Sequence, residues 1–374
     1  MSDNNNNKAL NTGRQFEIDL VRAACIVVMI IYHVFEMVTT ARVEPYLLKL
    51  AVYYAGNTLT GLFIICMGIG IVYTTHGTPA SFAKRGIKLL LQGHLLVFCN
   101  AGFMILISRK YGQMEDPYSV FTTEILAFAG LVFLLTALLT KLKCKSWHFF
   151  AVAGAFQVIA AVLSGAFDDS PLAVRYLVGT LFYPGSPDIS SFPLFPFFIY
   201  AAFGMLYGEM LKRTANKRLF YLRSAFIGTT VCLIASVIYK IVGFNIVEAS
   251  FYDAYHASVF PAAIWYISQA AVWIAIAYPV SLLLKGKAKN AVGYLSRNIT
   301  NIYVFQWILF QFLFWFMFHN EISCFSSVAG VPLSAGFLLV SIALSKCWTT
   351  VNNLRHSRTK TAIQKDRQYE HPDL

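Results

Sequence analysis

The sequence has few charged residues and lacks the motifs of several familiar protein classes. Only 13% of its 374 residues are charged, whereas soluble domains carry about a quarter. The seven cysteines form no CxxC pair, so no disulfide framework or structural zinc site is indicated. Walker, GxSxG and HExxH motifs are absent. The eight histidines are dispersed, and we expect no metal centre.

Long apolar runs dominate what is present. Hydrophobic residues make up 57% of the chain, and the mean hydropathy is +0.59. A helix needs about 20 mostly apolar residues to cross a bilayer. We therefore predict an all-α polytopic integral membrane protein with about ten transmembrane helices in one bundle. The predicted helices are 19–40, 52–75, 87–108, 119–140, 147–166, 193–211, 220–243, 257–284, 292–318 and 328–350.

The basic residues predict the orientation of this bundle. With the N-terminus in the cytoplasm, 22 of the 30 lysines and arginines fall on the inner side and six in outer loops. This asymmetry is typical of membrane proteins. It explains the net charge of +12 without a nucleic-acid partner. We expect both termini in the cytoplasm, with a polar tail over 1–13, the membrane domain over 14–354 and a basic tail over 355–374.

The longest predicted outer loop, 167–192, lies between the helices 147–166 and 193–211. Its middle, bounded by Pro171 and Pro184, is compatible with a short interfacial or re-entrant helix. An irregular connection fits the same sequence, and both interpretations stay open.

The first apolar stretch, RQFEIDLVRAACIVVMIIYHVFE over 14–36, contains Asp19, Arg22 and His33. Arg22 and His33 are eleven residues apart, or about three helical turns, so they share a face and stand about 16 Å apart. Ionisable residues inside a membrane helix are candidates for function. The alternative is that Asp19 and Arg22 anchor the helix at the interface and that His33 is a packed, hydrogen-bonded side chain.

Further polar residues occur on other predicted helices and loops, and each also has a structural interpretation. Helix–helix hydrogen bonds, interfacial placement, topology or snorkelling explain such residues without a ligand. The residues are Glu36, Asn57, Arg85, Lys88, Glu124, Arg297 and Asn301.

Asp19, Arg22 and, after ten intervening residues, His33 resemble the first-helix signature of the acyltransferase-3 family. The stretch is also similar to the catalytic domain of heparan-α-glucosaminide N-acetyltransferase, within the same transmembrane acyltransferase superfamily. Looser similarities are ILAFAGLVFLL, FPLFPFFIYAAFGMLYGE and LSRNITNIYVFQWIL. The chain departs from its relatives at Ala23, where many have glycine, and at Gln306, where a relative has histidine. Of a paired-arginine motif only Arg85 and Lys88 remain.

The resemblance implies an acyl-CoA donor, acetyl-CoA foremost, and a carbohydrate or glycan acceptor. It gives Arg22 and His33 as the important pair and Arg85 and Lys88 as donor contacts. We expect His33 to act as general base or to form an acyl-histidine, because neutral imidazole accepts protons near pH 7. Asp19 is expected beside Arg22. Arg297 and Asn301 are assigned to the donor side, and Glu36, Asn57 and Glu124 to the acceptor side.

A multi-pass transporter or flippase for a sugar-linked or small-metabolite substrate is the alternative function. It too needs polar groups on membrane helices, and His33 would then relay protons. No internal repeat of the kind found in many carriers is visible. We expect a bacterial cytoplasmic membrane as the location. Homo-oligomerisation, the acceptor and the choice between O- and N-transfer stay open.

Overall fold

The computed structural model describes residues 10–40, 46–75, 77–110, 117–163, 165–182, 190–243 and 259–370. This part of the chain is helical, with two isolated β-bridges and no strand. The predicted all-α class is therefore confirmed.

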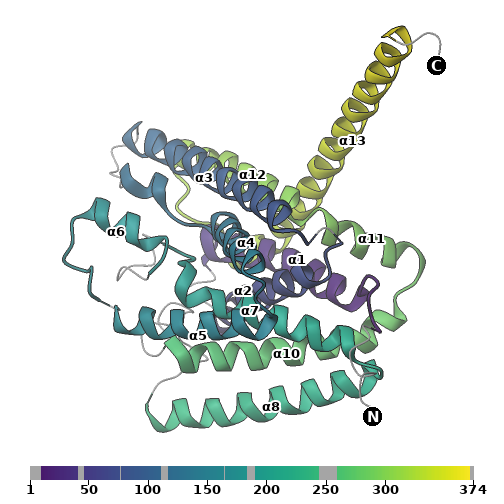
Figure 1. The fold of residues 1–374 in the computed structure, drawn as a ribbon. Coiled ribbons are helices and arrows are strands. Elements are labelled where there is room, and N and C mark those ends of the chain that lie inside the picture. Colours follow the sequence, from purple (N-terminus) through teal and green to yellow (C-terminus); the bar gives the residue numbers. More distant parts are fainter. Residues whose placement is uncertain are drawn as a thin grey trace.

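Twelve α-helices and two short 3₁₀ helices follow one another along the described chain (Figure 1). They are α1 (Phe16–Val38), α2 (Tyr46–Val72), α3 (Pro79–Lys110), η2 (Pro117–Phe121), α4 (Ile125–Lys141), α5 (Ser146–Val162), α6 (Leu172–Gly179), α7 (Leu194–Arg213), α8 (Lys217–Ile241), α10 (Val259–Leu283), α11 (Gly286–Arg297), α12 (Ile299–His319), η3 (Ser327–Ala329) and α13 (Gly330–Glu370).

Seven of these helices are long and apolar enough to cross a membrane, namely α1, α3, α7, α8, α10, α12 and α13. Helices α4 and α5 have 17 residues each, or about 25 Å, which is near the lower limit for a span. The segment Thr58–Val72 of α2 is also a shorter apolar helix. Each of the ten predicted stretches thus overlaps an apolar helix, and the chain is a multi-pass integral membrane protein.

The starts of α2, α3 and α4 each differ from the prediction by six residues or more, and α2 begins at Tyr46, where the sequence predicts position 52. Helix α3 begins at Pro79, because proline is well suited to the first turn of a helix. Arg85, which precedes the predicted helix 87–108, consequently lies on a helix. Helix α4 begins after Glu124, whose extended backbone caps it, and η2 precedes it.

The single helix predicted over 292–318 is wrong. The helix breaks at Asn298, where α11 ends and α12 begins. The Asn298 side-chain amide donates to the carbonyl of Tyr294 at 3.0 Å. Asparagine often offers the backbone such an alternative to helical hydrogen bonding. Residues before and after the break therefore do not share one continuous helical face.

The short helix considered for 167–192 is present as α6, which begins directly after Pro171. Pro184, the second predicted boundary, lies outside the described residues. Helix α13 stays helical to Glu370, so the predicted basic tail is helical over most of its length. The interfacial position of α6 stays a prediction.

Helix α1 lies at the centre of the bundle and packs against α2, α10, α11, α12 and α13. Its inward stripe includes Ile26, Ile30 and Val34, each with no exposed surface. These residues recur every four positions, the spacing of one helical face. The rest of the molecule is built around this helix.

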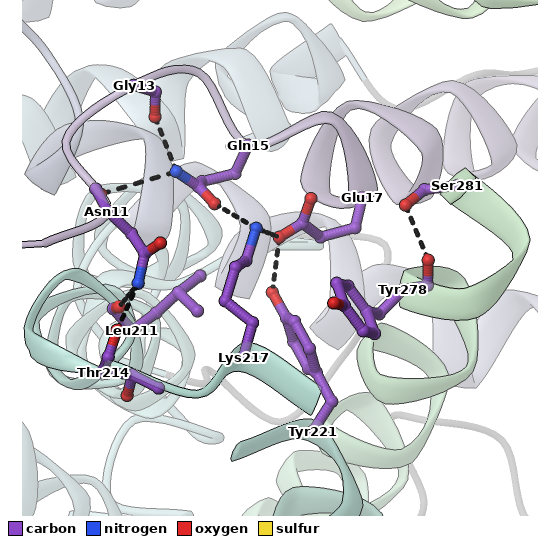
Figure 2. Close-up of polar contacts among 10 residues, drawn as sticks. All are labelled: Asn11, Gly13, Gln15, Glu17, Leu211, Thr214, Lys217, Tyr221, Tyr278 and Ser281. Atoms are coloured by element: carbon purple, nitrogen blue, oxygen red, sulfur yellow. Dashed lines mark hydrogen bonds and ion pairs between the residues drawn. The ribbon is translucent and has the colours of Figure 1, made fainter. Parts of the chain in front are cut away.

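Polar contacts fix the N-terminal end of α1 to α8 (Figure 2). The buried carboxylate of Glu17 forms an ion pair with Lys217 and accepts from the Tyr221 hydroxyl at 2.9 Å. Lys217 also donates to Gln15 Oε1 at 2.6 Å. At the other end of α1, the backbone of Thr40 and Val38 bonds to Phe325 at 2.9 and 2.8 Å. Both ends of α1 are thus held.

Helices α2 and α7 approach closely at Gly68 and Gly204. A Cβ on Gly68 would lie 2.1 Å from the carbonyl oxygen of Ala201, and one on Gly204 would lie 2.1 Å from that of Ile65. Small residues commonly let membrane helices meet in this way. This contact fixes α2, which contributes to the cavities described below, against α7.

We predict that Gly68→Ala destabilises the protein, because the added methyl group forces the two backbones apart. Overpacking of this kind costs about 1–3 kcal/mol. Gly70→Ala is the matched control, since a Cβ there meets nothing within 4 Å. Melting of both variants in detergent, followed by size-exclusion chromatography, measures the difference. Equal melting temperatures would contradict close packing at Gly68.

Candidate functional site

The candidate site extends along one face of α1, between Arg22 and His33. Apolar residues fill the helix, and the acidic residues Glu17 and Asp19 lie in its first turn, where they complement the helix dipole. Arg22 and His33 are both half-buried. Eleven residues separate them, which places the two side chains about 16 Å apart along the helix axis.

A cavity of about 140 Å³, named the inner cavity after the predicted orientation, surrounds the Arg22 end of this face. Residues of α1, α2, α3, α4 and α12 line it, and Arg85 of α3 joins Arg22 there. The guanidinium carbon of Arg85 lies 4.4 Å from the ring centroid of Phe133, a cation–π distance. Two guanidinium groups at one small cavity favour an anionic or carbonyl-rich ligand, because both offer several N–H donors.

An outer cavity of about 70 Å³ lies at the His33 end. Glu124, the residue that caps α4, lines it together with His33. The hydroxyl-bearing Tyr32 and Thr60 are also at its wall. A base, a carboxyl group and hydroxyls are therefore gathered at one small cavity.

The two cavities adjoin each other. Met29, Phe63, Ile125 and Tyr303 line both of them. These side chains are mostly apolar and come from four helices, α1, α2, α4 and α12. These four side chains therefore form a shared wall between the end with the two arginines and the end with His33.

The ring of His33 is held by α12. The side-chain amide nitrogen of Gln306 lies 2.6 Å from Nδ1 of His33, and the ring centroid of Trp307 lies 5.3 Å from that of His33. Gln306 is fully buried, and its Oε1 has no hydrogen-bond partner among the described residues. These contacts leave little freedom to the imidazole, and His33 also lines the outer cavity.

Asp19 belongs to a different cluster. Its buried carboxylate pairs with Arg14 and accepts from the Ser296 hydroxyl at 2.6 Å. Among the described residues it forms no ion pair with Arg22. Asp19 thus joins the N-terminal end of α1 to α11, and it is absent from both cavity walls.

Other predicted site residues also lie away from the cavity walls. Lys88 is exposed on α3, and Arg297 is exposed at the end of α11. Asn301 on α12 and Glu36 on α1 are both half-buried, and neither residue lines a cavity. The break at Asn298 separates Arg297 from α12. Asn301 lies on α12 two residues before Tyr303, about 200° away around the helix, and so on another face. The side chain of Asn57 lies outside the described residues.

Sequence reasoning missed the roles of Tyr303 and Trp307 as wall residues and of Gln306 as the partner of His33. Aromatic residues are frequent on α12, so nothing in its pattern distinguishes a wall residue from ordinary packing. The four-residue spacing of Tyr303 and Trp307 was the available signal. Among the described residues, no group of three or more His, Cys, Asp and Glu side chains is arranged to hold a metal ion.

Comparison with protein families identifies the chain. Residues 14–238, more than half of its length, match the family described as heparan-alpha-glucosaminide N-acetyltransferase, catalytic. The chain belongs to this family. No match was found among curated proteins.

The family supports a membrane acetyltransferase that acts on glycans. The match includes all of α1 and the residues from α2, α3 and α4 that line the two cavities. Helix α12, with Tyr303 and Gln306, lies outside the matched residues.

Proposed function

We propose that the protein transfers an acetyl group from cytoplasmic acetyl-CoA to a glycan acceptor on the opposite side of the membrane. The observation that carries this proposal is the pair of adjoining cavities along α1. Two arginines stand at one end of the pair, and a histidine and a glutamate at the other. The family match favours a transferase over the transporter that the sequence alone leaves open.

The inner cavity fits only a narrow part of the donor. Its volume of about 140 Å³ is below the range of roughly 300–1,000 Å³ that encloses most whole ligands. The nucleotide of acetyl-CoA would therefore stay at the basic inner surface, and the slender thioester arm would enter. Arg22 and Arg85 are suited to hold amide carbonyl or phosphate oxygens of that arm.

His33 would accept a proton from the acceptor. As the acceptor hydroxyl or amine loses this proton, its oxygen or nitrogen attacks the thioester carbonyl. The carbon–sulfur bond breaks, and coenzyme A leaves as a thiol after taking up a proton. Glu124, at the same cavity, is positioned to orient the acceptor. General-base catalysis of this type contributes about 10²–10⁴-fold to a rate.

Gln306 would select the tautomer that His33 needs. The two ends of a side-chain amide have nearly the same shape, and a half-turn exchanges them. When Oε1 of Gln306 faces His33, it accepts from Nδ1–H of the imidazole. Nε2 of His33 then keeps its lone pair and can accept the proton of the acceptor. The amide NH₂ then takes the place of the buried Oε1. Gln306 is thus a positioning residue.

The proposed orientation is supported by the predicted inner segments, which come together at the Arg22 end of α1. Asn11 donates to the carbonyls of Leu211, near the end of α7, and of Thr214, between α7 and α8 (Figure 2). Ser296 of α11 reaches Asp19 at the same end. Segments predicted on one side of the membrane therefore meet on one side of the bundle, which supports a donor site facing the cytoplasm.

We predict that His33→Ala abolishes acetyl transfer while the protein remains folded and membrane-inserted. The rate should fall by about 10²-fold or more, because the base is lost. Transfer of radiolabelled acetyl groups to a panel of amino sugars and glycans, in detergent, gives the measurement. His94→Ala is the control, since His94 is a half-buried histidine that lines neither cavity. Full activity of His33→Ala would rule out its role as base.

Replacement of Arg22 by alanine should raise the KM for acetyl-CoA. Hydrogen bonds to charged groups contribute about 1.5–3 kcal/mol, so a loss of roughly tenfold to hundredfold in donor affinity is expected. The KM for the acceptor should change little. Lys240→Ala, which removes an exposed charge at the far end of α8, on the predicted outer side, serves as control. Unchanged binding of acetyl-CoA by the Arg22 variant would exclude Arg22 from the donor site.

The role of Gln306 predicts two different kinetic effects. Gln306→Leu should lower kcat with little change in the KM for acetyl-CoA, because the imidazole loses its orientation. Gln306→Glu places a carboxylate on His33 and stabilises the imidazolium, so the acid limb of the pH–rate profile should move to higher pH. A merely structural residue would lower activity without moving this limb.

A further inference from the structure

A third and larger hollow lies away from α1, between α5, α7, α8 and α10. Its volume is about 840 Å³. Its walls are mainly apolar and include Phe203, Met210, Phe220, Ile227, Ile264 and Ile267. A hollow of this size is within the range of ligand sites, and neither cavity along α1 shares its residues.

The hollow lies on the lipid-facing perimeter of the membrane domain. Helices α7, α8 and α10 are all candidate spans, and α8 is the least buried of the seven. In Figure 1, α8 lies at the edge of the molecule beside α10. Gly228 brings α8 and α10 together, since a Cβ there would lie 2.7 Å from the Ser268 carbonyl oxygen. The hollow is therefore bordered by a helix that faces lipid.

The polar groups in the middle of the hollow bond to the protein itself. The hydroxyls of Tyr207 and Ser224 lie 3.0 Å apart, and Ser268 donates to the carbonyl of Trp265 at 2.7 Å. This part of the wall therefore offers a ligand mostly apolar surface, which suits hydrocarbon chains.

One end of the hollow is basic. Arg213, at the end of α7, and Arg223 of α8 both line it, as does Asn216 between them. Arg213 lies 3.6 Å from the carboxylate of Glu209, but Glu209 also accepts from Ser146 at 2.7 Å. Both guanidinium groups remain exposed, and their two positive charges exceed the single negative charge of Glu209.

We propose that the hollow binds an anionic phospholipid, with its phosphate between Arg213 and Arg223 and its acyl chains along the apolar wall. Guanidinium groups pair with phosphate through two parallel hydrogen bonds. The basic end coincides with the predicted inner surface, where anionic headgroups attract basic residues by about 1 kcal/mol each. The lipid would stabilise the junction of α7 and α8, where Lys217, the first residue of α8, holds α1 through Glu17.

The test uses purified full-length protein in detergent, titrated with phosphatidylglycerol or with phosphatidylcholine of identical acyl chains. Native mass spectrometry and melting temperature report binding. We expect phosphatidylglycerol to bind and to raise the melting temperature of the wild type, and phosphatidylcholine to act much less. In Arg213→Gln/Arg223→Gln the apparent affinity for phosphatidylglycerol should fall roughly thirtyfold.

Two controls separate this site from general attraction. Lys285→Gln/Lys287→Gln removes the same charge from another exposed inner segment and should keep the response to phosphatidylglycerol. Ile227→Trp adds bulk to an exposed side chain of the wall and should weaken the response while both arginines remain. Inorganic phosphate alone should produce no stabilisation.

Three results would overturn the proposal. An equal loss of affinity in the two charge variants would indicate attraction by net charge alone. An equal response to both lipids, or full stabilisation by inorganic phosphate, would exclude an anionic phospholipid as the ligand of the hollow. Light scattering that shows a dimer broken by Ile227→Trp, without any effect of lipid, would assign the hollow to a second copy of the chain.

Discussion

The arrangement of the molecule depends on the ion pair between Glu17 and Lys217. Glu17 is buried, and Lys217 and Tyr221 satisfy its carboxylate from α8 (Figure 2). A buried carboxylate without partners is strongly unfavourable, so other registers of α1 against α8 are disfavoured. Because a helix is nearly rigid along its axis, fixing its end also fixes the depth of Arg22 and His33. The chemistry along α1 thus depends on a contact that lies outside both cavities.

Much of the fold could be predicted from the sequence, because membrane helices are set by long apolar runs. The stretches 19–40 and 220–243 contain most of α1 and α8, and the short α6 follows Pro171 as considered. The break at Asn298 could not be predicted. Residues on both sides of it continue an acceptable helical pattern, and only the side-chain bond to Tyr294 marks the end of α11. Hydropathy reflects the transfer of side chains into lipid. It is insensitive to one side chain that competes with the backbone for a hydrogen bond.

The candidate site was only partly predictable for a related reason. Spacing within α1 places Arg22 and His33 on one face, since that relation is local to one helix. The rotation of α3, α4 and α12 against α1 depends on packing between distant segments. Arg85 and Glu124 therefore line the cavities, while Lys88 and Asn301 do not. Nothing in the sequence distinguishes the two residues that line a cavity from the two that do not. Gln306 was visible only as a departure from relatives, and its contact with His33 gives the residue a physical role.

The junction of the two cavities also affects the membrane itself. Met29, Phe63, Ile125 and Tyr303 form a narrow, largely apolar partition halfway along α1. An ion that enters such a region loses its hydration without gaining a counter-charge, which is costly in the middle of a bilayer. A thioester is uncharged and bears no such cost. The partition would therefore let an uncharged acyl group cross while it opposes the leakage of protons and salts, so that the membrane potential is preserved.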